Sequence, residues 1–258
     1  MKIGLQLYTV RRAANNDLFS TLKAAAELGY LTFEYSYAPF SKENAQIINQ
    51  AAQQFAISLS AIQARLVILE ERFKEITQFL QATSCPAANI SVMPQEYQRG
   101  STYMLSQMLK RIDKLALRYA DYGIVLNYHH HDFEFVGKKG SRQIDFILDK
   151  LQNAGLIIDT YWVTKGGEYV PHLLEKAKGK VYGLHLRDYC LRKGFIFPRV
   201  HDCALGDGVI DFAEVIACAE KIGAVYGAVE QKTAIPFREI TKSIDYLKSI
   251  GYARLLEA

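Results

Sequence analysis

Residues 124–135 have the sequence IVLNYHHHDFEF, an apolar, β-branched run that ends in a group of ionisable side chains. A buried parallel strand has this pattern when its C-terminal end opens into a functional site. Side chains alternate faces along a strand, so His129 and His131 are expected on one face and His130 on the other. Three of the six histidines of the chain lie here. A histidine-rich turn at the surface is the alternative interpretation.

Strand-like and helix-like segments alternate along the whole chain. Apolar, β-branched runs predict eight strands, at residues 3–8, 31–35, 58–64, 88–93, 124–129, 156–159, 181–186 and 225–230. Apolar residues at helical spacing predict helices between them, at residues 18–28, 43–55, 69–82, 102–122, 141–154, 170–177, 212–222 and 235–250. Asp17 is placed to cap the first helix, and Gly29 is placed to end it.

This strict alternation predicts the architecture. Strands separated by helices form a parallel sheet, and eight such units in 258 residues favour a closed (β/α)8 TIM barrel over an open, doubly wound sheet. An open sheet that bound a dinucleotide would carry a GxGxxG motif after its first strand, and the sequence has none there. We therefore expect residues 1–258 to form a single TIM-barrel domain of the α/β class.

The composition narrows the classes of partner. The formal net charge is +4 and the basic residues are spread along the chain, so no nucleic-acid partner is expected. No apolar stretch approaches the roughly 20 residues that span a bilayer, and the N-terminus lacks a signal-peptide pattern, so we expect a cytoplasmic protein with no membrane partner. The four cysteines have no CxxC spacing and are expected to be reduced. The sequence leaves the oligomeric state open.

Ionisable residues stand at the C-terminal ends of the predicted strands, where the active site of a TIM barrel lies. Imidazole and carboxylate groups that converge from several strands match the ligand preferences of a divalent metal ion such as Zn²⁺, Mn²⁺ or Co²⁺. Taken singly, Asp159 could instead cap the following helix, and Arg187 could form a surface ion pair with Asp188. The strand-end residues are Glu34, His129, His131, Asp159, His185, Arg187, Glu230 and Lys232.

Four motifs resemble the xylose isomerase-like TIM-barrel superfamily, which includes sugar isomerases and epimerases, inosose dehydratases and the endonuclease IV branch. Residues 4–11, GLQLYTVR, resemble the first strand of its sugar phosphate isomerase/epimerase members, and residues 128–135, YHHHDFEF, are close to a YHNHDFEF motif. Residues 184–188, LHLRD, contain a segment close to HLKD, and residues 206–212, GDGVIDF, resemble a GxGxxDF loop. The resemblance extends over the whole chain in order.

The resemblance implies a metal centre formed by a Glu, an Asp, a His or Gln and a Glu from the fifth to the eighth strand. Asp159, His185 and Glu230 match the last three positions, and His129 stands where many members have the first Glu. The implied cofactor is one divalent ion, Mn, Co, Zn or Fe. Histidine at this position removes one of the two glutamates that transfer protons in the epimerases. Trp162 stands where the endonuclease IV branch has a further His ligand, which disfavours phosphodiester hydrolysis.

The implied function is that of a metal-dependent sugar isomerase or epimerase, which acts on a keto-sugar or sugar phosphate through an enediolate. A lyase that acts on a keto-polyol and a non-catalytic sugar-binding barrel are the alternatives. Glu230 is expected to be both ligand and base, and His131 the second acid/base, because imidazole titrates near neutral pH. Residues 206–208 are expected to form a mobile cover or an ordinary turn. The expected substrate-binding residues are Gln6 and Glu34 for hydroxyl groups, Tyr8 and Trp162 for the apolar face of the sugar unless they are core aromatics, and Arg187 or Lys232 for an oxyanion or phosphate.

Overall fold

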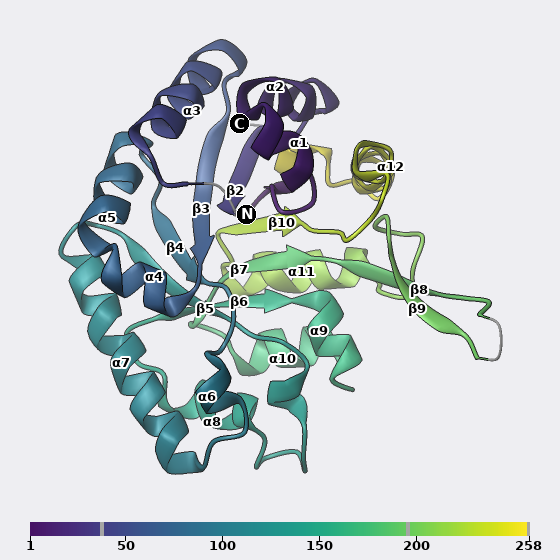
Figure 1. Cartoon of the computed structure of the whole chain (residues 1–258). Helices are drawn as coiled ribbons and strands as arrows, with labels where there is room; N and C mark the ends of the chain where they lie inside the picture. The colour runs from purple at the N-terminus through teal and green to yellow at the C-terminus, as the bar shows by residue number, and fades with distance from the viewer. Residues whose placement is uncertain (37–38, 195–196, 257–258) are drawn as a thin grey trace.

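A computed structural model describes residues 1–36, 39–194 and 197–256, and its centre is a closed eight-stranded barrel (Figure 1). Every neighbouring pair of barrel strands is parallel. The prediction of a (β/α)8 TIM barrel is therefore confirmed, while the single domain over residues 1–258 stays a prediction. The barrel strands are β1 (Lys2–Gln6), β2 (Thr32–Ser36), β3 (Ser58–Ala64), β4 (Ala87–Ile90), β5 (Val125–His129), β6 (Gly155–Asp159), β7 (Val181–Leu186) and β10 (Tyr226–Val229).

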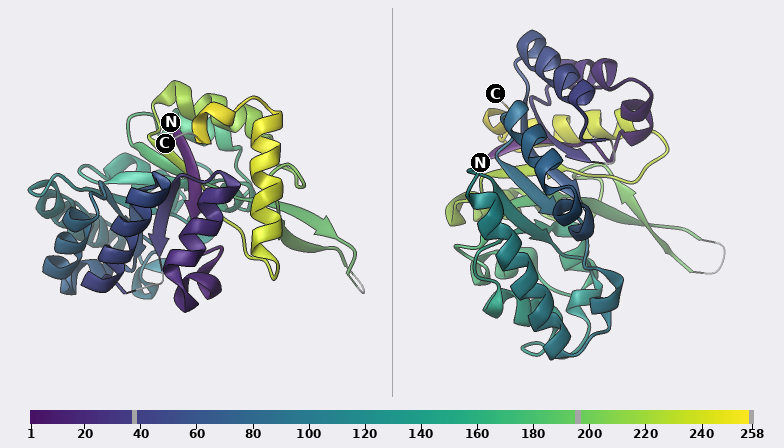
Figure 2. Two further views of the ribbon diagram at one scale, coloured as in Figure 1. Left: turned by 90° about the horizontal axis from the view of Figure 1, so that it is seen from above. Right: turned by 60° about the vertical axis from the view of Figure 1, so that its left-hand side comes forward.

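Helices cover the outside of the barrel, and Figure 2 shows them around the strands from two further directions. The longer helices turn an apolar face inward. The longest helix, α7, buries residues three and four positions apart, which is the spacing that keeps side chains on one face. The helices are α1 (Arg11–Asn16), α2 (Leu18–Leu28), α3 (Lys42–Phe55), α4 (Leu66–Glu71), α5 (Phe73–Ala82), α6 (Gln95–Gln98), α7 (Thr102–Ala120), η1 (Phe133–Phe135), α8 (Gln143–Lys150), α9 (Thr160–Lys165), α10 (Val170–Lys176), α11 (Phe212–Ile222), α12 (Pro236–Ser249) and η2 (Ala253–Leu256).

Local sequence signals set the helix ends. The Asp17 side chain accepts a hydrogen bond from the backbone N–H of Ser20 at the start of α2, which satisfies a donor that the helix itself leaves free. Gly29 ends α2 with a φ of 108°, a left-handed conformation in which a side chain would be strained. Both predicted boundaries are confirmed.

The segment between β7 and α11 contains a hairpin that the sequence pattern did not predict. Strands β8 (Asp188–Arg192) and β9 (Arg199–Cys203) form a two-stranded antiparallel sheet that projects from the barrel (Figure 1). The hairpin returns the chain to the barrel mouth, so that Asp202 meets Arg187. A second difference is that the helix predicted at 69–82 is two helices, α4 and α5, which meet at Arg72.

Two expectations from composition are also tested. Within the described residues, no helix is long and apolar enough to cross a membrane. All four cysteines are free thiols, in agreement with the expected reduced state.

Candidate metal centre

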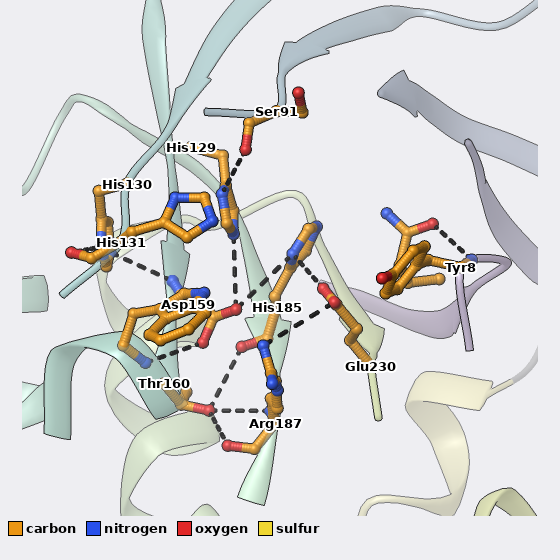
Figure 3. A network of polar contacts seen from close by, with 12 residues as sticks. Tyr8, Ser91, His129, His130, His131, Asp159, Thr160, His185, Arg187 and Glu230 are labelled. Atoms are coloured by element: carbon orange, nitrogen blue, oxygen red, sulfur yellow. Dashed lines mark hydrogen bonds and ion pairs between the residues drawn. The ribbon is translucent and has the colours of Figure 1, made fainter. Parts of the chain in front are cut away.

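Three predicted metal ligands converge at the C-terminal mouth of the barrel (Figure 3). His129 ends β5, Asp159 ends β6, and His185 lies near the end of β7. One ligand atom from each side chain lies within 4.8 Å of the other two, and all three side chains are buried. Asp159 Oδ2 is 3.5 Å from His129 Nε2 and 4.0 Å from His185 Nδ1.

These three atoms have no hydrogen-bond partner among the described residues, although all are buried. Leaving buried polar atoms unsatisfied is costly, and a buried carboxylate needs a cation or a donor. Two imidazole nitrogens and one carboxylate oxygen that face a common point form a donor set that suits Zn²⁺ and other divalent transition metals. The residues therefore fit a metal ion.

Glu230, the residue directly after β10, is the fourth predicted metal ligand. Its Oε2 lies 2.9 Å from His185 Nδ1, but the angle does not make this contact a hydrogen bond, since Nδ1 stays unpartnered. Two ligand atoms that bind the same metal ion lie this close to each other without a hydrogen bond between them. Burial alone would raise the pKa of the Glu230 carboxyl, but His185 and Arg187 outweigh burial and lower it. Glu230 therefore stays ionised at neutral pH.

The outer nitrogen of each imidazole is held by an oxygen. His129 Nδ1 lies 3.2 Å from the carbonyl oxygen of Ser91, and His185 Nε2 lies 3.0 Å from Glu34 Oε2. If each outer nitrogen carries the proton, the inner nitrogen presents its lone pair to the metal position, as is usual for metal-binding histidines. Burial and the charge of His185 lower the pKa of His129 to about 3, so His129 is neutral, as a ligand must be. Burial alone would lower the pKa of His185, but Glu34 and Glu230 outweigh it and raise that pKa. His185 therefore carries a proton in the metal-free site, and a bound metal ion would displace it.

Glu34, which was predicted to contact sugar hydroxyls, lies beneath the metal position. The side chain is fully buried, and its Oε2 also accepts a hydrogen bond from the Tyr226 hydroxyl at 2.7 Å. The Tyr226 hydroxyl in turn accepts a hydrogen bond from the Asn89 side chain, so polar side chains fill the barrel interior next to His185. A Cβ at Gly183 would lie 2.6 Å from the Tyr226 ring, so glycine at this position makes room for the tyrosine. Glu34 thus orients a candidate metal ligand through Oε2, and its Oε1 is buried without a partner among the described residues.

Gln6 is likewise held by the chain itself. Its Oε1 accepts hydrogen bonds from Tyr8 N at 3.1 Å and from Ser36 Oγ at 2.7 Å. Its Nε2 is buried and has no partner among the described residues. Only the amide nitrogen of Gln6 is left for a ligand.

Glu134 holds the segment that follows His129 in place through hydrogen bonds. This buried carboxyl accepts hydrogen bonds from the Tyr128 hydroxyl at 2.5 Å and from the backbone N–H of His131 at 2.9 Å. Burial raises the pKa of Glu134 to about 8. The same segment turns His130 away from the centre, where its Nε2 accepts the backbone N–H of Asp159 at 3.2 Å. The motif therefore shapes the turn after β5.

His131 lies beside His129 as predicted, with ring centroids 5.0 Å apart, and it also contacts the ring of Trp162. Its expected titration near neutral pH is contradicted. Burial and the neighbouring His129 lower the pKa of His131 to about 3. The imidazole is therefore neutral at pH 7, and in the metal-free site it is a weak base.

Arg187 is a buried cation beside the metal position. Its Nε and one terminal nitrogen donate to Asp202 at 2.8 and 3.1 Å, and its other terminal nitrogen lies 4.0 Å from Glu230 Oε1. The guanidinium is also 5.0 Å from the Trp162 ring centroid. Burial disfavours the charge, but the carboxylates of Glu230, Asp159 and Asp202 raise the pKa of Arg187 further. Arg187 supplies a fixed positive charge at the mouth.

Tyr8, Trp162 and Lys232 form the rim. The Lys232 ammonium lies 5.8 Å from the Tyr8 ring centroid and 6.0 Å from the Trp162 ring centroid. The structure therefore brings the three predicted rim residues close together, with the two aromatic rings on the segments that follow β1 and β6.

The glycine loop at 206–208 is anchored, which favours the turn over the mobile cover. Asp188 is buried and its carboxylate accepts the backbone N–H groups of Gly206, Gly208, Val209 and Ile210. Asp188 therefore does not form the surface ion pair with Arg187 that was the alternative.

The sequence of residues 22–250 matches the family model of the xylose isomerase-like TIM barrel. The chain belongs to this family. No curated protein matches the sequence. The resemblance read from the motifs is thus confirmed at the level of the family.

Several solved structures share the fold of this chain at low sequence identity. A sugar phosphate isomerase/epimerase from Parabacteroides distasonis ATCC 8503 is 17% identical, with a TM-score of 0.80 over 98% of this chain and 95% of that chain. The IolI protein with a bound zinc atom is 15% identical, with a TM-score of 0.74 over 99% and 98%. The probable 3-DHS dehydratase AsbF from Bacillus anthracis is 10% identical, with a TM-score of 0.76 over 96% and 99%. These likenesses establish the shared barrel.

Sequence reasoning missed several residues around the centre. Asp202 lies on the unpredicted hairpin. Tyr226 is an aromatic residue in a strand, which is common and gives no sign of a functional role. Ser91 acts through its backbone carbonyl, which carries no sequence signal. Thr160 accepts the Arg187 N–H and donates to the Arg187 carbonyl oxygen through its hydroxyl, and only its position directly after Asp159 could have suggested a role.

Proposed function

We propose that this protein binds one divalent metal ion through His129, Asp159, His185 and Glu230, and that it is a sugar isomerase or epimerase. The observation that carries the proposal is the set of three buried, unpartnered ligand atoms at the barrel mouth. When bound, the ion would polarise a substrate carbonyl and acidify the neighbouring C–H group. The identity of the ion, Mn, Co, Zn or Fe, is left open by this mixed donor set. The partner is a small keto-sugar or polyol.

Glu230 is our candidate for the base that removes the carbon-bound proton. It stays ionised because His185 and Arg187 lie beside it, and removal of a proton next to a carbonyl requires a carboxylate or another base within reach. His131 is our candidate for the second acid/base, because it contacts the Trp162 ring and its buried Nδ1 has no partner among the described residues. The two groups approach the opening from different strands, as transfer between two carbons or two faces requires.

Arg187 stabilises the negative charge that forms on the substrate oxygen. Asp202 holds the Arg187 guanidinium in place through two hydrogen bonds. The positive charge of Arg187 is therefore in position before the reaction, and no reorganisation is needed during it. Tyr8 and Trp162 wall the opening and limit the access of water.

Metal content tests the first part of the proposal. We expect about one divalent ion per chain in the purified protein, and loss of the ion in His185→Ala. His172→Ala, which removes an exposed histidine on α10, is the matched control and should keep the ion. Absence of metal after incubation with each candidate ion would overturn the proposed centre.

Proton exchange tests the reaction. The metal-loaded protein, incubated in D₂O with keto-sugars and inososes, should replace one carbon-bound proton by deuterium, and Glu230→Gln should not. A product that has lost water would identify a lyase, since elimination follows the same proton removal. Metal binding without exchange on any of these compounds would identify a non-catalytic sugar-binding barrel.

A further inference from the structure

A basic cavity of about 310 Å³ opens beside the metal centre, between the β1–α1 turn and the β10–α12 loop. Residues 9–13 form one wall, and residues 232–234 with Pro236 form the other. Three of these residues are cations, Arg11, Arg12 and Lys232, and none is acidic. We call this cavity the basic pocket.

The positive charge of the basic pocket has no internal counterion. Among the described residues, none of its three cations forms an ion pair with a carboxylate. The other cations at the rim are compensated, since Arg187 pairs with Asp202 and Lys165 pairs with Asp132. Like charges gathered without counterions repel one another, and a bound anion removes this cost.

The basic pocket is held in shape by its walls. Thr9 Oγ1 accepts the backbone N–H of Gln231 at 3.0 Å, which ties the two walls together. The Arg11 guanidinium donates to the carbonyl oxygen of Tyr8 at 2.8 Å and lies 4.1 Å from the Tyr8 ring centroid. These contacts fix one cation in advance, which lowers the entropy cost of binding a ligand.

Lys232 connects the basic pocket to the metal centre. It lies two residues beyond Glu230, and its ammonium reaches the space between Tyr8 and Trp162. Figure 3 shows Tyr8 on the same side of the centre as Glu230. A molecule with its carbonyl end at the metal position can therefore place its other end in the basic pocket.

The usual place for a phosphate on this fold is already filled. A glycine-rich loop after the seventh barrel strand can bind phosphate through its backbone N–H groups. Here the corresponding N–H groups of Gly206, Gly208, Val209 and Ile210 donate to Asp188, a buried carboxylate that occupies the place of the anion. An anionic substrate group must bind elsewhere, and the basic pocket is beside the centre.

We propose that the basic pocket binds a phosphate or carboxylate group of the substrate, so that the protein acts on an acidic sugar or polyol. The proposal of a substrate rests on the proposed function, but the binding of an anion does not require the metal. Arginine and lysine together suit an oxyanion, through paired N–H donors and a point charge.

Anion binding to the metal-free protein tests this proposal. Inorganic phosphate and glycolate are titrated by calorimetry at constant ionic strength into chelator-treated wild type, Arg12→Met and Lys232→Met. Both side chains are exposed, so the variants should fold. We expect saturable binding at low-millimolar concentration or tighter, weakened about tenfold by each substitution. The control Arg99→Met removes an exposed cation outside the basic pocket and should bind as wild type does.

Each outcome of the titrations tests a different part of the proposal. Binding of phosphate alone indicates a phosphorylated substrate, and binding of glycolate alone indicates a carboxylated one. Failure of both anions to bind, or binding that neither substitution weakens, overturns the basic pocket as an anion site. Metal content measured on the same variants keeps the two proposals separate. Anion binding by a protein that holds no metal before chelator treatment, even after incubation with each candidate ion, would overturn the proposed metal centre and leave the anion site standing.

Discussion

Glu134 should make the stability of the protein fall as the pH rises. Its carboxyl is buried and its pKa is raised from 4.5 to about 8. Between these two values the folded chain holds a proton that the unfolded chain has released. The contribution of Glu134 is therefore complete below about pH 4.5 and is lost as the pH rises through about 8.

The magnitude follows from the two pKa values. A shift of one pKa unit is worth about 1.4 kcal/mol, so the loss between pH 5 and pH 8 is on the order of 3 kcal/mol for this group alone. Glu134→Gln replaces the protonated acid by a neutral group of nearly the same shape. The amide can still accept the His131 N–H and bond the Tyr128 hydroxyl.

The assay is urea unfolding of wild type and Glu134→Gln at pH 5, 6, 7 and 8. The free energy of unfolding of wild type should be close to that of the variant at pH 5 and should fall below it as the pH rises, so that the difference between them changes by the amount above. Glu71→Gln removes an exposed glutamate and should follow the wild-type curve. A difference between wild type and Glu134→Gln that is constant across this range would refute the raised pKa.

Three further predictions concern the residues around the centre. Glu34→Gln should weaken metal affinity about 10- to 100-fold, as measured by competition with a chelating dye, and unchanged affinity would exclude Glu34 as the partner of the ligand histidine. Asp202→Ala leaves Arg187 buried without its bidentate partner and should lower the free energy of unfolding by about 3 kcal/mol, as seen in urea titration; a loss near zero would show that the hairpin is not coupled to the barrel. Gly208→Ala would place a Cβ 2.1 Å from Asp188 Oδ1 and should cost about 1–3 kcal/mol in thermal unfolding, whereas a mobile loop would absorb the methyl group at no cost.

The barrel and three residues of the candidate metal centre could be predicted from the sequence because their signals are local. Strand and helix periodicity extends over a few residues, and the C-terminal ends of parallel strands meet at one face. His129, Asp159 and His185 each end an apolar run, so that knowing the fold was enough to bring them together. The charge state of His131 could not be predicted in the same way, because burial that lowers its pKa depends on residues from other strands.

The sequence by itself determined the (β/α)8 barrel, the family and the donor set of the centre, since each follows from short patterns and from their order along the chain. Only the tertiary structure decided what supports and surrounds that centre. Glu34 and His185 are 151 residues apart, and no local pattern links a carboxylate on β2 to an imidazole on β7. The Arg187–Asp202 pair likewise requires the hairpin to fold back onto the barrel mouth. Such contacts depend on distances between segments, which barrel closure sets.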